Sequence, residues 1–172
     1  PGSSVVVAVH RNGSAAHPAP TDAALRAALG VDATICRRPD GKPESGNGRA
    51  ISASRAGDLT LAVAGAAPLG CDVEAVIVQS PEAWRDLLGE HRLGLARLLA
   101  REGAEDENAA ATRVWSAMEC LKKAGVAHDA PLTLGAREAD GWVTLRSGDL
   151  VAATYVGAVR GSDDRMAFSV LA

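Results

Sequence analysis

The chain has 172 residues, of which 47% are hydrophobic and 23% are charged, so it is long and apolar enough to bury a core. Aromatic residues make up only 3% and the formal net charge is -3, which argues against a base-stacking or basic nucleic-acid module. No apolar run reaches the ~20 residues of a membrane span, and the cysteines lack paired metal-site spacing. We therefore expect a cytoplasmic protein with no nucleic-acid or membrane partner. The chain opens on Pro1 without a methionine, which suggests a segment of a longer polypeptide.

The first half of the chain is predicted to be a small α+β unit. Thr21 and Asp22 can cap a short Ala/Leu helix that Gly30 ends. The stretch 39–49 is glycine-rich and is expected to be irregular. The remaining apolar runs predict strands over 5–9, 33–38, 59–63 and 69–74. The first of these runs is β-branched throughout apart from Ala8, which is typical of a buried strand.

The second half is predicted to begin with two helices. Ser80 and Pro81 form a start signal for the first helix, and Gly103 ends it. Its residues that recur at helical spacing are Trp84, Leu87, Leu88, His91, Leu95, Leu98 and Leu99. The second helix is expected over about 105–124, with a core face of Ala110, Val114, Ala117, Met118 and Leu121. From residue 132 onward strands alternate with turns at 140–141, 147–149 and 161–164.

These elements predict the α+β class. We expect a single domain, 1–172, built of two similar fused halves of roughly 1–75 and 76–172. Each half would pack helices on an antiparallel sheet, and the active cleft would lie between the halves. No internal sequence repeat is detectable.

Two clusters of charged residues point to chemistry. Asp72 and Glu74 alternate along a predicted strand, so they share one face. Glu119 and Lys123 stand one turn apart on the second predicted helix. Carboxylates and an ammonium that converge in this way suit a hard divalent cation holding a phosphate ester.

Four motifs occur in a fixed order: Gly-Lys-Pro at 41–43, Ile-Ser-Ala-Ser-Arg-Ala-Gly at 51–57, Gly-Cys-Asp-Val-Glu at 70–74 and Trp-Ser-x-x-Glu-x-x-x-Lys at 115–123. In order and spacing they resemble the signature of the 4′-phosphopantetheinyl transferase superfamily, of the holo-acyl-carrier-protein synthase type. The run Glu-Cys-Leu-Lys-Lys-Ala-Gly at 119–125 is most similar to transferase domains fused to bacterial iterative polyketide synthases of the enediyne type.

The resemblance implies transfer of the phosphopantetheine arm of coenzyme A to a serine of an acyl carrier protein, with release of 3′,5′-adenosine bisphosphate. It implies Mg²⁺ held by Asp72, Glu74 and Glu119, a phosphate contact from Lys123, and a second role of Glu119 as the base. Catalysis would then depend on Asp72, Glu119 and Lys123. The coenzyme A contacts are implied at Lys42, Pro43, Ser54, Arg55, Asp72 and Lys123.

Two positions depart from the family pattern. Arg55 stands where histidine is common, although arginine can also pair with a phosphate. Met118 stands where lysine commonly precedes the helix glutamate, so one contact of that lysine is missing. Arg37 and Arg38 are basic neighbours that no motif places in the anion site.

Alternative interpretations remain open at the level of sequence. One is a catalytically weakened domain that binds coenzyme A or a carrier protein as a scaffold, and another is an unrelated magnesium-dependent phosphoesterase. Taken singly, a strand-end pair of carboxylates or a helix-surface ion pair is more often structural. Cys71 and Cys120 are interpreted as small core residues rather than nucleophiles, because neither is expected to face the carboxylates.

Overall fold

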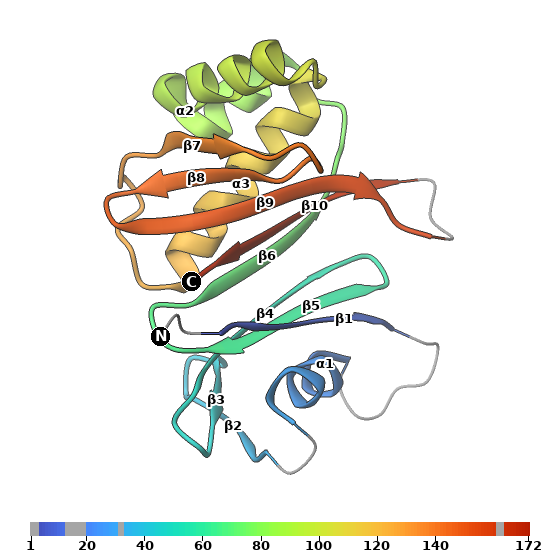
Figure 1. The fold of residues 1–172 in the computed structure, drawn as a ribbon, viewed down its shortest axis with the longest axis vertical. Coiled ribbons are helices and arrows are strands. Elements are labelled where there is room, and N and C mark those ends of the chain that lie inside the picture. Colours follow the sequence, from blue (N-terminus) through green and yellow to red (C-terminus); the bar gives the residue numbers. More distant parts are fainter. Residues whose placement is uncertain (1–3, 13–19, 31–32, 161–163) are drawn as a thin grey trace.

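The computed structural model describes residues 4–12, 20–30, 33–160 and 164–172 (Figure 1). The first elements along the chain are β1 (Val6–Arg11), α1 (Pro20–Leu29), β2 (Ile35–Arg37), β3 (Pro43–Ser45), β4 (Ala50–Ala56) and β5 (Leu59–Gly65). They are followed by β6 (Gly70–Ala75), α2 (Pro81–Gly103), α3 (Glu107–Lys123), β7 (Thr133–Arg137), β8 (Val143–Ser147), β9 (Leu150–Ala158) and β10 (Arg165–Leu171). The mixed α+β class is confirmed: the described residues form three helices and three antiparallel sheets.

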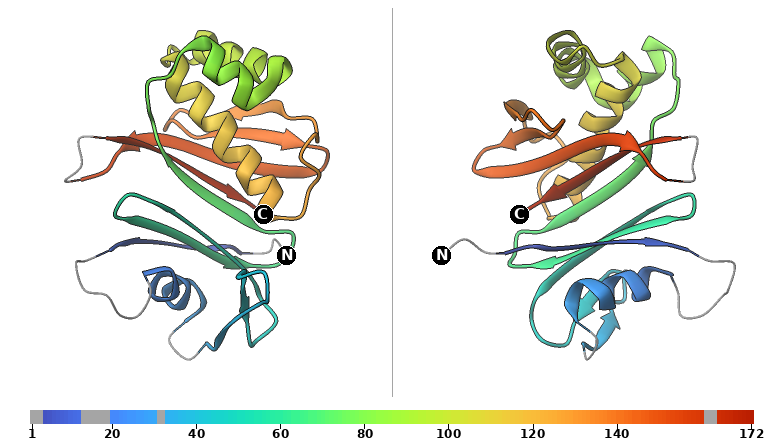
Figure 2. Two further views of the ribbon diagram at one scale, coloured as in Figure 1. Left: turned by 180° about the vertical axis from the view of Figure 1, so that it is seen from behind. Right: turned by 45° about the vertical axis from the view of Figure 1, so that its right-hand side comes forward.

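Two of the sheets organise the molecule. The three-stranded sheet has the order β1-β5-β4, and α1 covers one of its faces through Ala24, Leu25 and Ala28. The five-stranded sheet has the order β6-β10-β9-β8-β7, and α3 runs across it with α2 packed outside α3 (Figure 2). The third sheet is the short β2-β3 ladder.

Strand β6 connects the two larger sheets. Its hydrogen-bonded neighbour is β10, so this strand, which the sequence grouped with the first half, belongs by its pairing to the five-stranded sheet. At the other edge of β6, the backbone N–H of Cys71 donates to Ser52 Oγ of β4 at 3.2 Å. Leu61 and Val63 of β5 share a buried apolar cluster with Val73 of β6. The two sheets therefore meet along β6.

Strand β1 forms as predicted, but the expectation that it is buried is wrong. Val6, Val7 and Val9 keep 40%, 50% and 57% of their surface exposed. The reason is that β1 is an end strand of its sheet and pairs only with β5. A run of β-branched residues predicts the extended backbone but not how many neighbours will cover it.

Helix α2 begins and ends where the sequence predicts. Ser80 caps it by accepting the N–H of Ala83 at 3.2 Å. Inside the helix, however, Gly89 adopts φ 72 and ψ 164 and breaks the helical phase. As a result His91, which follows Gly89 and was placed on the apolar face, is exposed. Leu87, which was placed on that face too but precedes the break, is also exposed. Leu93 and Ala96 are buried in their place.

Helix α3 follows its predicted pattern closely. Asp106 caps it by accepting the N–H of Ala109 at 2.9 Å. All five residues of the predicted core face are buried: Ala110, Val114, Ala117, Met118 and Leu121. Glu119 and Lys123 lie beside this face and are partly exposed.

The later strands β7 to β10 agree with the alternation of strands and turns predicted after residue 132. The predicted turn at 161–164 lies outside the described residues except for Asp164. Strand β4 was not predicted, and β3 lies in a stretch that was expected to be irregular. Among the described helices, none combines the length and apolarity that crossing a membrane would require.

Candidate functional site

The centre of the candidate site is a contact between β6 and the last turn of α3. Asp72 is buried to 2% exposure. The Nζ atom of Lys123 lies 2.7 Å from Asp72 Oδ1 and 3.0 Å from the backbone oxygen of Cys71. Two residues that were predicted to converge from separate motifs therefore form an ion pair.

Gly70 allows β6 to approach α3 so closely. A Cβ atom at this position would lie 2.2 Å from the backbone oxygen of Cys120, which is far inside van der Waals contact. Because both sides of this contact are backbone, no side-chain movement could relieve it. The glycine of the Gly-Cys-Asp-Val-Glu motif thus sets the distance between Asp72 and Lys123.

A third element, β4, also reaches Asp72. Ser54 Oγ donates to Asp72 Oδ1 at 2.7 Å. The adjacent Arg55 is exposed, and strand alternation turns it to the opposite face of β4. Of the two residues in this motif that were assigned to coenzyme A, the structure brings Ser54 to the carboxylate and leaves Arg55 away from it.

Glu74 lies two residues further along β6 and is partly buried. Burial is the main cause that raises the pKa of Glu74 above its ordinary value, and the neighbouring charge of Asp72 adds to it. The Trp115 side chain and the charge of Lys123 both oppose the rise in pKa. Glu119 contributes a further small increase in that pKa, so the three carboxylates act on one another electrostatically.

Glu119 makes a different ion pair from the one its spacing indicated. Its Oε1 atom lies 3.1 Å from Nζ of Lys122, three residues along the helix. Lys123 instead extends to Asp72. The side chain of Glu119 is 19% exposed, whereas that of Lys122 is 62% exposed and solvated.

The carboxylates have the chemistry of a magnesium site, although within the described part of the chain no group of three His, Cys, Asp or Glu side chains has the geometry of a bound metal. Asp72 Oδ2 is buried and has no hydrogen-bond partner among the described residues. A buried carboxylate oxygen without a partner is costly unless a cation or a donor meets it. Hard oxygen ligands are the ones that Mg²⁺ prefers, so Asp72, Glu74 and Glu119 fit this ion by donor type.

A pocket of about 860 Å³ opens beside Lys123. Its walls come from the β2–β3 turn, β3, β4, the β5–β6 connection and the residues that follow α3. Its basic residues are Arg38, Lys42, Arg49 and Lys123, against two acidic residues, Asp40 and Glu44. Pro43 also lines it. Two residues predicted for coenzyme A, Lys42 and Pro43, therefore share a pocket with Lys123.

The other arginines near this pocket either line it or bind a neighbouring element. Arg38 lines the pocket, whereas Arg37 hydrogen-bonds Asp22 of α1. Arg49 was missed by the sequence analysis, and it also donates to the backbone oxygen of Ala64 at 3.0 Å. Its only signal in the sequence is a positive charge shortly after the Gly-Lys-Pro motif.

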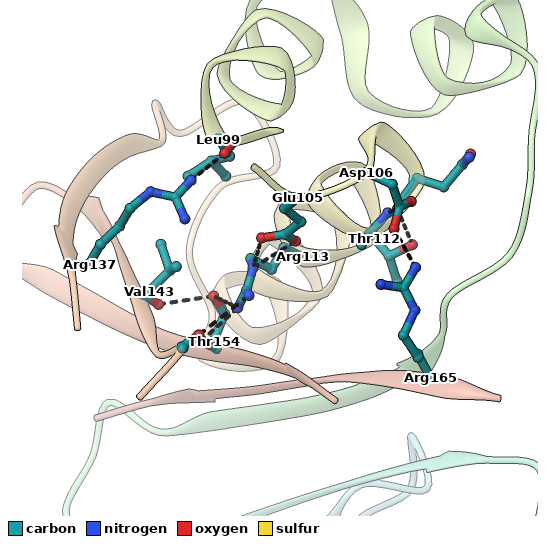
Figure 3. A network of polar contacts seen from close by, with 12 residues as sticks. Leu99, Glu105, Asp106, Thr112, Arg113, Arg137, Val143, Thr154 and Arg165 are labelled. Carbon is teal, nitrogen blue, oxygen red and sulfur yellow. Dashed lines mark hydrogen bonds and ion pairs between the residues drawn. The ribbon is translucent and has the colours of Figure 1, made fainter. Parts of the chain in front are cut away.

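Helix α3 is fixed over the sheet by the buried Arg113 (Figure 3). Its Nε atom lies 3.1 Å from Glu105 Oε1, and its Nη1 atom donates to the backbone oxygen of Thr154 at 2.9 Å. Because α3 carries both Glu119 and Lys123, this network sets where those two side chains leave the helix.

The two buried cysteines are core residues, as predicted. Cys71 and Cys120 have no exposed surface. Burial raises the pKa of Cys71 to about 11 and that of Cys120 well above its ordinary value. Both thiols are therefore protonated at neutral pH, and neither is a nucleophile.

Comparison with known proteins adds no assignment, since neither the protein-family models nor the curated proteins include a match to this chain.

Proposed function

We propose that this chain is a magnesium-dependent 4′-phosphopantetheinyl transferase that moves the phosphopantetheine arm of coenzyme A to a serine of an acyl carrier protein. The observation that carries the proposal is the 2.7 Å contact between Asp72 and Lys123, because Lys123 also lines the basic pocket. A carboxylate cluster and an anion-binding pocket thereby share one side chain. Such an arrangement is suited to stabilising the charge that develops during transfer from a pyrophosphate.

Asp72, Glu74 and Glu119 would hold the magnesium ion. The Oδ2 atom of Asp72 supports this role because it has no partner among the described residues, although Oδ1 pairs with Lys123. The raised pKa of Glu74 supports it because burial leaves the charge of that carboxylate poorly stabilised. The ion, when bound, neutralises charge on the pyrophosphate oxygens during transfer.

Coenzyme A would occupy the pocket of about 860 Å³, a volume in the range of small-molecule sites. Lys42, Arg49 and Arg38 supply positive charge for its phosphate groups. Pro43 contributes an apolar part of the wall. Neither Ser54 nor Arg55 lines the pocket, so neither is part of this proposed contact.

In the proposed reaction the serine hydroxyl of the carrier attacks the phosphorus that bears the pantetheine arm. A new P–O bond forms to serine, and the P–O bond to the bridging oxygen breaks. The leaving group is 3′,5′-adenosine bisphosphate. The serine proton passes to Glu119. Lys123, which donates to Asp72 and to the backbone oxygen of Cys71, would use its third N–H for a phosphate oxygen as charge develops there.

We further propose that the two sheets with their helices correspond to two fused halves, with the basic pocket as the cleft between them. The pocket draws its wall from β3 and β4 on one side and from the end of α3 on the other, which supports this view. The resemblance to enediyne-type synthase domains makes a carrier domain of a polyketide synthase the proposed partner.

The test is incubation of an apo carrier protein with this chain, coenzyme A and Mg²⁺, followed by mass spectrometry of the carrier. A gain of the phosphopantetheine mass is expected, and it should disappear in Asp72→Ala and in Glu119→Ala. Asp86→Ala, at an exposed position on α2, is the matched control and should retain the full gain. An undiminished gain in the two site variants would refute the site.

The second candidate is a scaffold domain that binds coenzyme A or a carrier without transfer. It is favoured by Lys123, which pairs with Asp72 Oδ1, and by Met118 at the position of the family's lysine. Calorimetric binding of coenzyme A with no mass gain on any carrier would support this function over the transferase.

A further inference from the structure

A row of polar side chains crosses three strands beneath α3. Asp72 of β6 pairs in register with Ser169 of β10, and Ser169 pairs with Thr154 of β9. Directly paired residues of antiparallel strands point to the same face, with Cβ atoms about 4.5–5.5 Å apart. This face is the one that α3 covers, because Arg113 of α3 donates to Thr154 Oγ1 at 3.2 Å. The Sγ atom of Cys120 donates to the backbone oxygen of Ser169 at 3.3 Å.

The hydrogen-bonding capacity of this row is only partly used. Thr154 Oγ1 accepts from Arg113 and donates to the backbone oxygen of Val143 at 2.9 Å. By contrast, Asp72 Oδ2 and Ser169 Oγ are both buried and have no partner among the described residues. Asp72 is 2% exposed and Ser169 is fully buried, so bulk water cannot serve either atom.

The two unpartnered atoms are chemically complementary. Asp72 Oδ2 can only accept a hydrogen bond when the carboxylate is ionised, and a serine hydroxyl can donate one. The other carboxylate oxygen, Oδ1, already accepts from Ser54 and Lys123. The carboxylate is therefore held on one side only, and the cross-strand neighbour on its other side carries an unused donor.

From this juxtaposition we infer that Ser169 is a positioning residue for Asp72. Its hydroxyl donates to Asp72 Oδ2, either directly after rotation about χ1 or across one internal water. Buried waters in proteins occupy such places between otherwise unsatisfied polar groups. The bond fixes the carboxylate plane that Ser54 and Lys123 hold from the opposite side. Its consequence for catalysis rests on the proposed function, whereas the bond itself does not.

Partners that orient a ligating carboxylate typically contribute 10- to 100-fold to metal affinity or activity. We therefore expect Ser169→Ala to weaken Mn²⁺ binding, measured by electron paramagnetic resonance, by about tenfold. The kcat for transfer should fall by a similar factor, while the KM for coenzyme A stays unchanged because Ser169 does not line the pocket.

Ser147→Ala is the matched control. Ser147 is also a buried serine of the five-stranded sheet, but it lies at the end of β8 beside the turn to β9, outside the quoted motifs, and it is not a ladder neighbour of Asp72. It should leave Mn²⁺ affinity and kcat unchanged. Equal effects of the two substitutions would overturn the inference, since both would then report only the loss of a buried hydroxyl.

A crystal structure of the metal-free protein separates this inference from the proposed function. Ser169 Oγ is expected within hydrogen-bond distance of Asp72 Oδ2, or bound to the same water. A Ser169 hydroxyl bonded to a backbone carbonyl instead would overturn the inference even if the protein is an active transferase. Failure of transfer in the wild-type protein, with the Ser169–Asp72 bond present, would overturn the proposed function alone.

Discussion

Glu74 shows how one partly buried carboxylate can couple the stability of the fold to pH. Its pKa is raised above the ordinary value of 4.5, chiefly by burial and then by the charge of Asp72. The folded protein therefore holds this proton more firmly than the unfolded chain, and the ionised carboxylate destabilises the fold. This cost is absent below the ordinary pKa and is fully present once the pH exceeds the raised one.

We accordingly predict that Glu74→Gln raises the thermal unfolding midpoint at neutral pH in metal-free buffer. The gain should shrink as the pH falls toward the ordinary glutamate range, where both side chains are uncharged. Differential scanning calorimetry across this pH range measures it. Added Mg²⁺ should stabilise the wild type more than the variant, and a lower midpoint for the metal-free variant at neutral pH would contradict the assignment.

At the scale of elements, the contact between β6 and the end of α3 depends on Gly70. We predict that Gly70→Ala destabilises the protein by about 1–3 kcal/mol, the usual cost of overpacking a tight contact. It should also remove most of the proposed transferase activity, because separating the two elements moves Lys123 away from Asp72. Urea unfolding and the carrier mass assay measure the two effects.

Gly94→Ala is the control for that substitution. Gly94 lies within α2, and a Cβ there would meet no atom within 4 Å. Alanine at this site should stabilise the helix by up to about 1 kcal/mol. If both glycine variants behaved alike, the close approach at Gly70 would not be what holds the site together.

The anchoring of α3 gives a second prediction at this scale. Arg113→Met would leave Glu105, whose side chain is 12% exposed, without its partner, and breaking a buried pair typically costs 3–5 kcal/mol. The exposed pair of Arg165 with Asp106 makes the comparison (Figure 3), and Arg165→Ala should cost less than about 1 kcal/mol. Urea unfolding distinguishes the two, and similar losses would show that burial does not decide the strength of these pairs.

The success of sequence reasoning varied among the elements for physical reasons. Helix α3 was predicted with its core face because its apolar periodicity is unbroken. In α2 the same reasoning misplaced His91, since Gly89 shifts the helical phase and residue type alone does not reveal that this glycine has a positive φ. It also misplaced Leu87, which precedes Gly89 and is exposed. Strand β1 was predicted to be buried because residue type reveals extended structure but not a position at the sheet edge.

For the molecule as a whole, the motifs anticipated the meeting of Asp72 with Lys123 across about fifty residues of sequence. They did not reveal that Lys123 would pair with Asp72 while Glu119 pairs with Lys122. Which partner a charged helix residue takes depends on the element that packs against the helix. They also assigned both Ser54 and Arg55 to coenzyme A, although alternation along β4 points these two side chains to opposite faces of the strand. Pairing of β6 with β10 joins residues nearly a hundred positions apart and leaves no local signal.

The chain passes from the three-stranded sheet to the five-stranded sheet once, between β5 and β6, through the exposed residues Ala66, Ala67 and Pro68. Ala67 and Pro68 also line the basic pocket. Cleavage of this crossing by a protease such as elastase should therefore slow when a ligand fills the pocket. Densitometry of the intact protein band would then report occupancy of the pocket by coenzyme A without any turnover. A digestion rate that coenzyme A does not change would place its binding elsewhere.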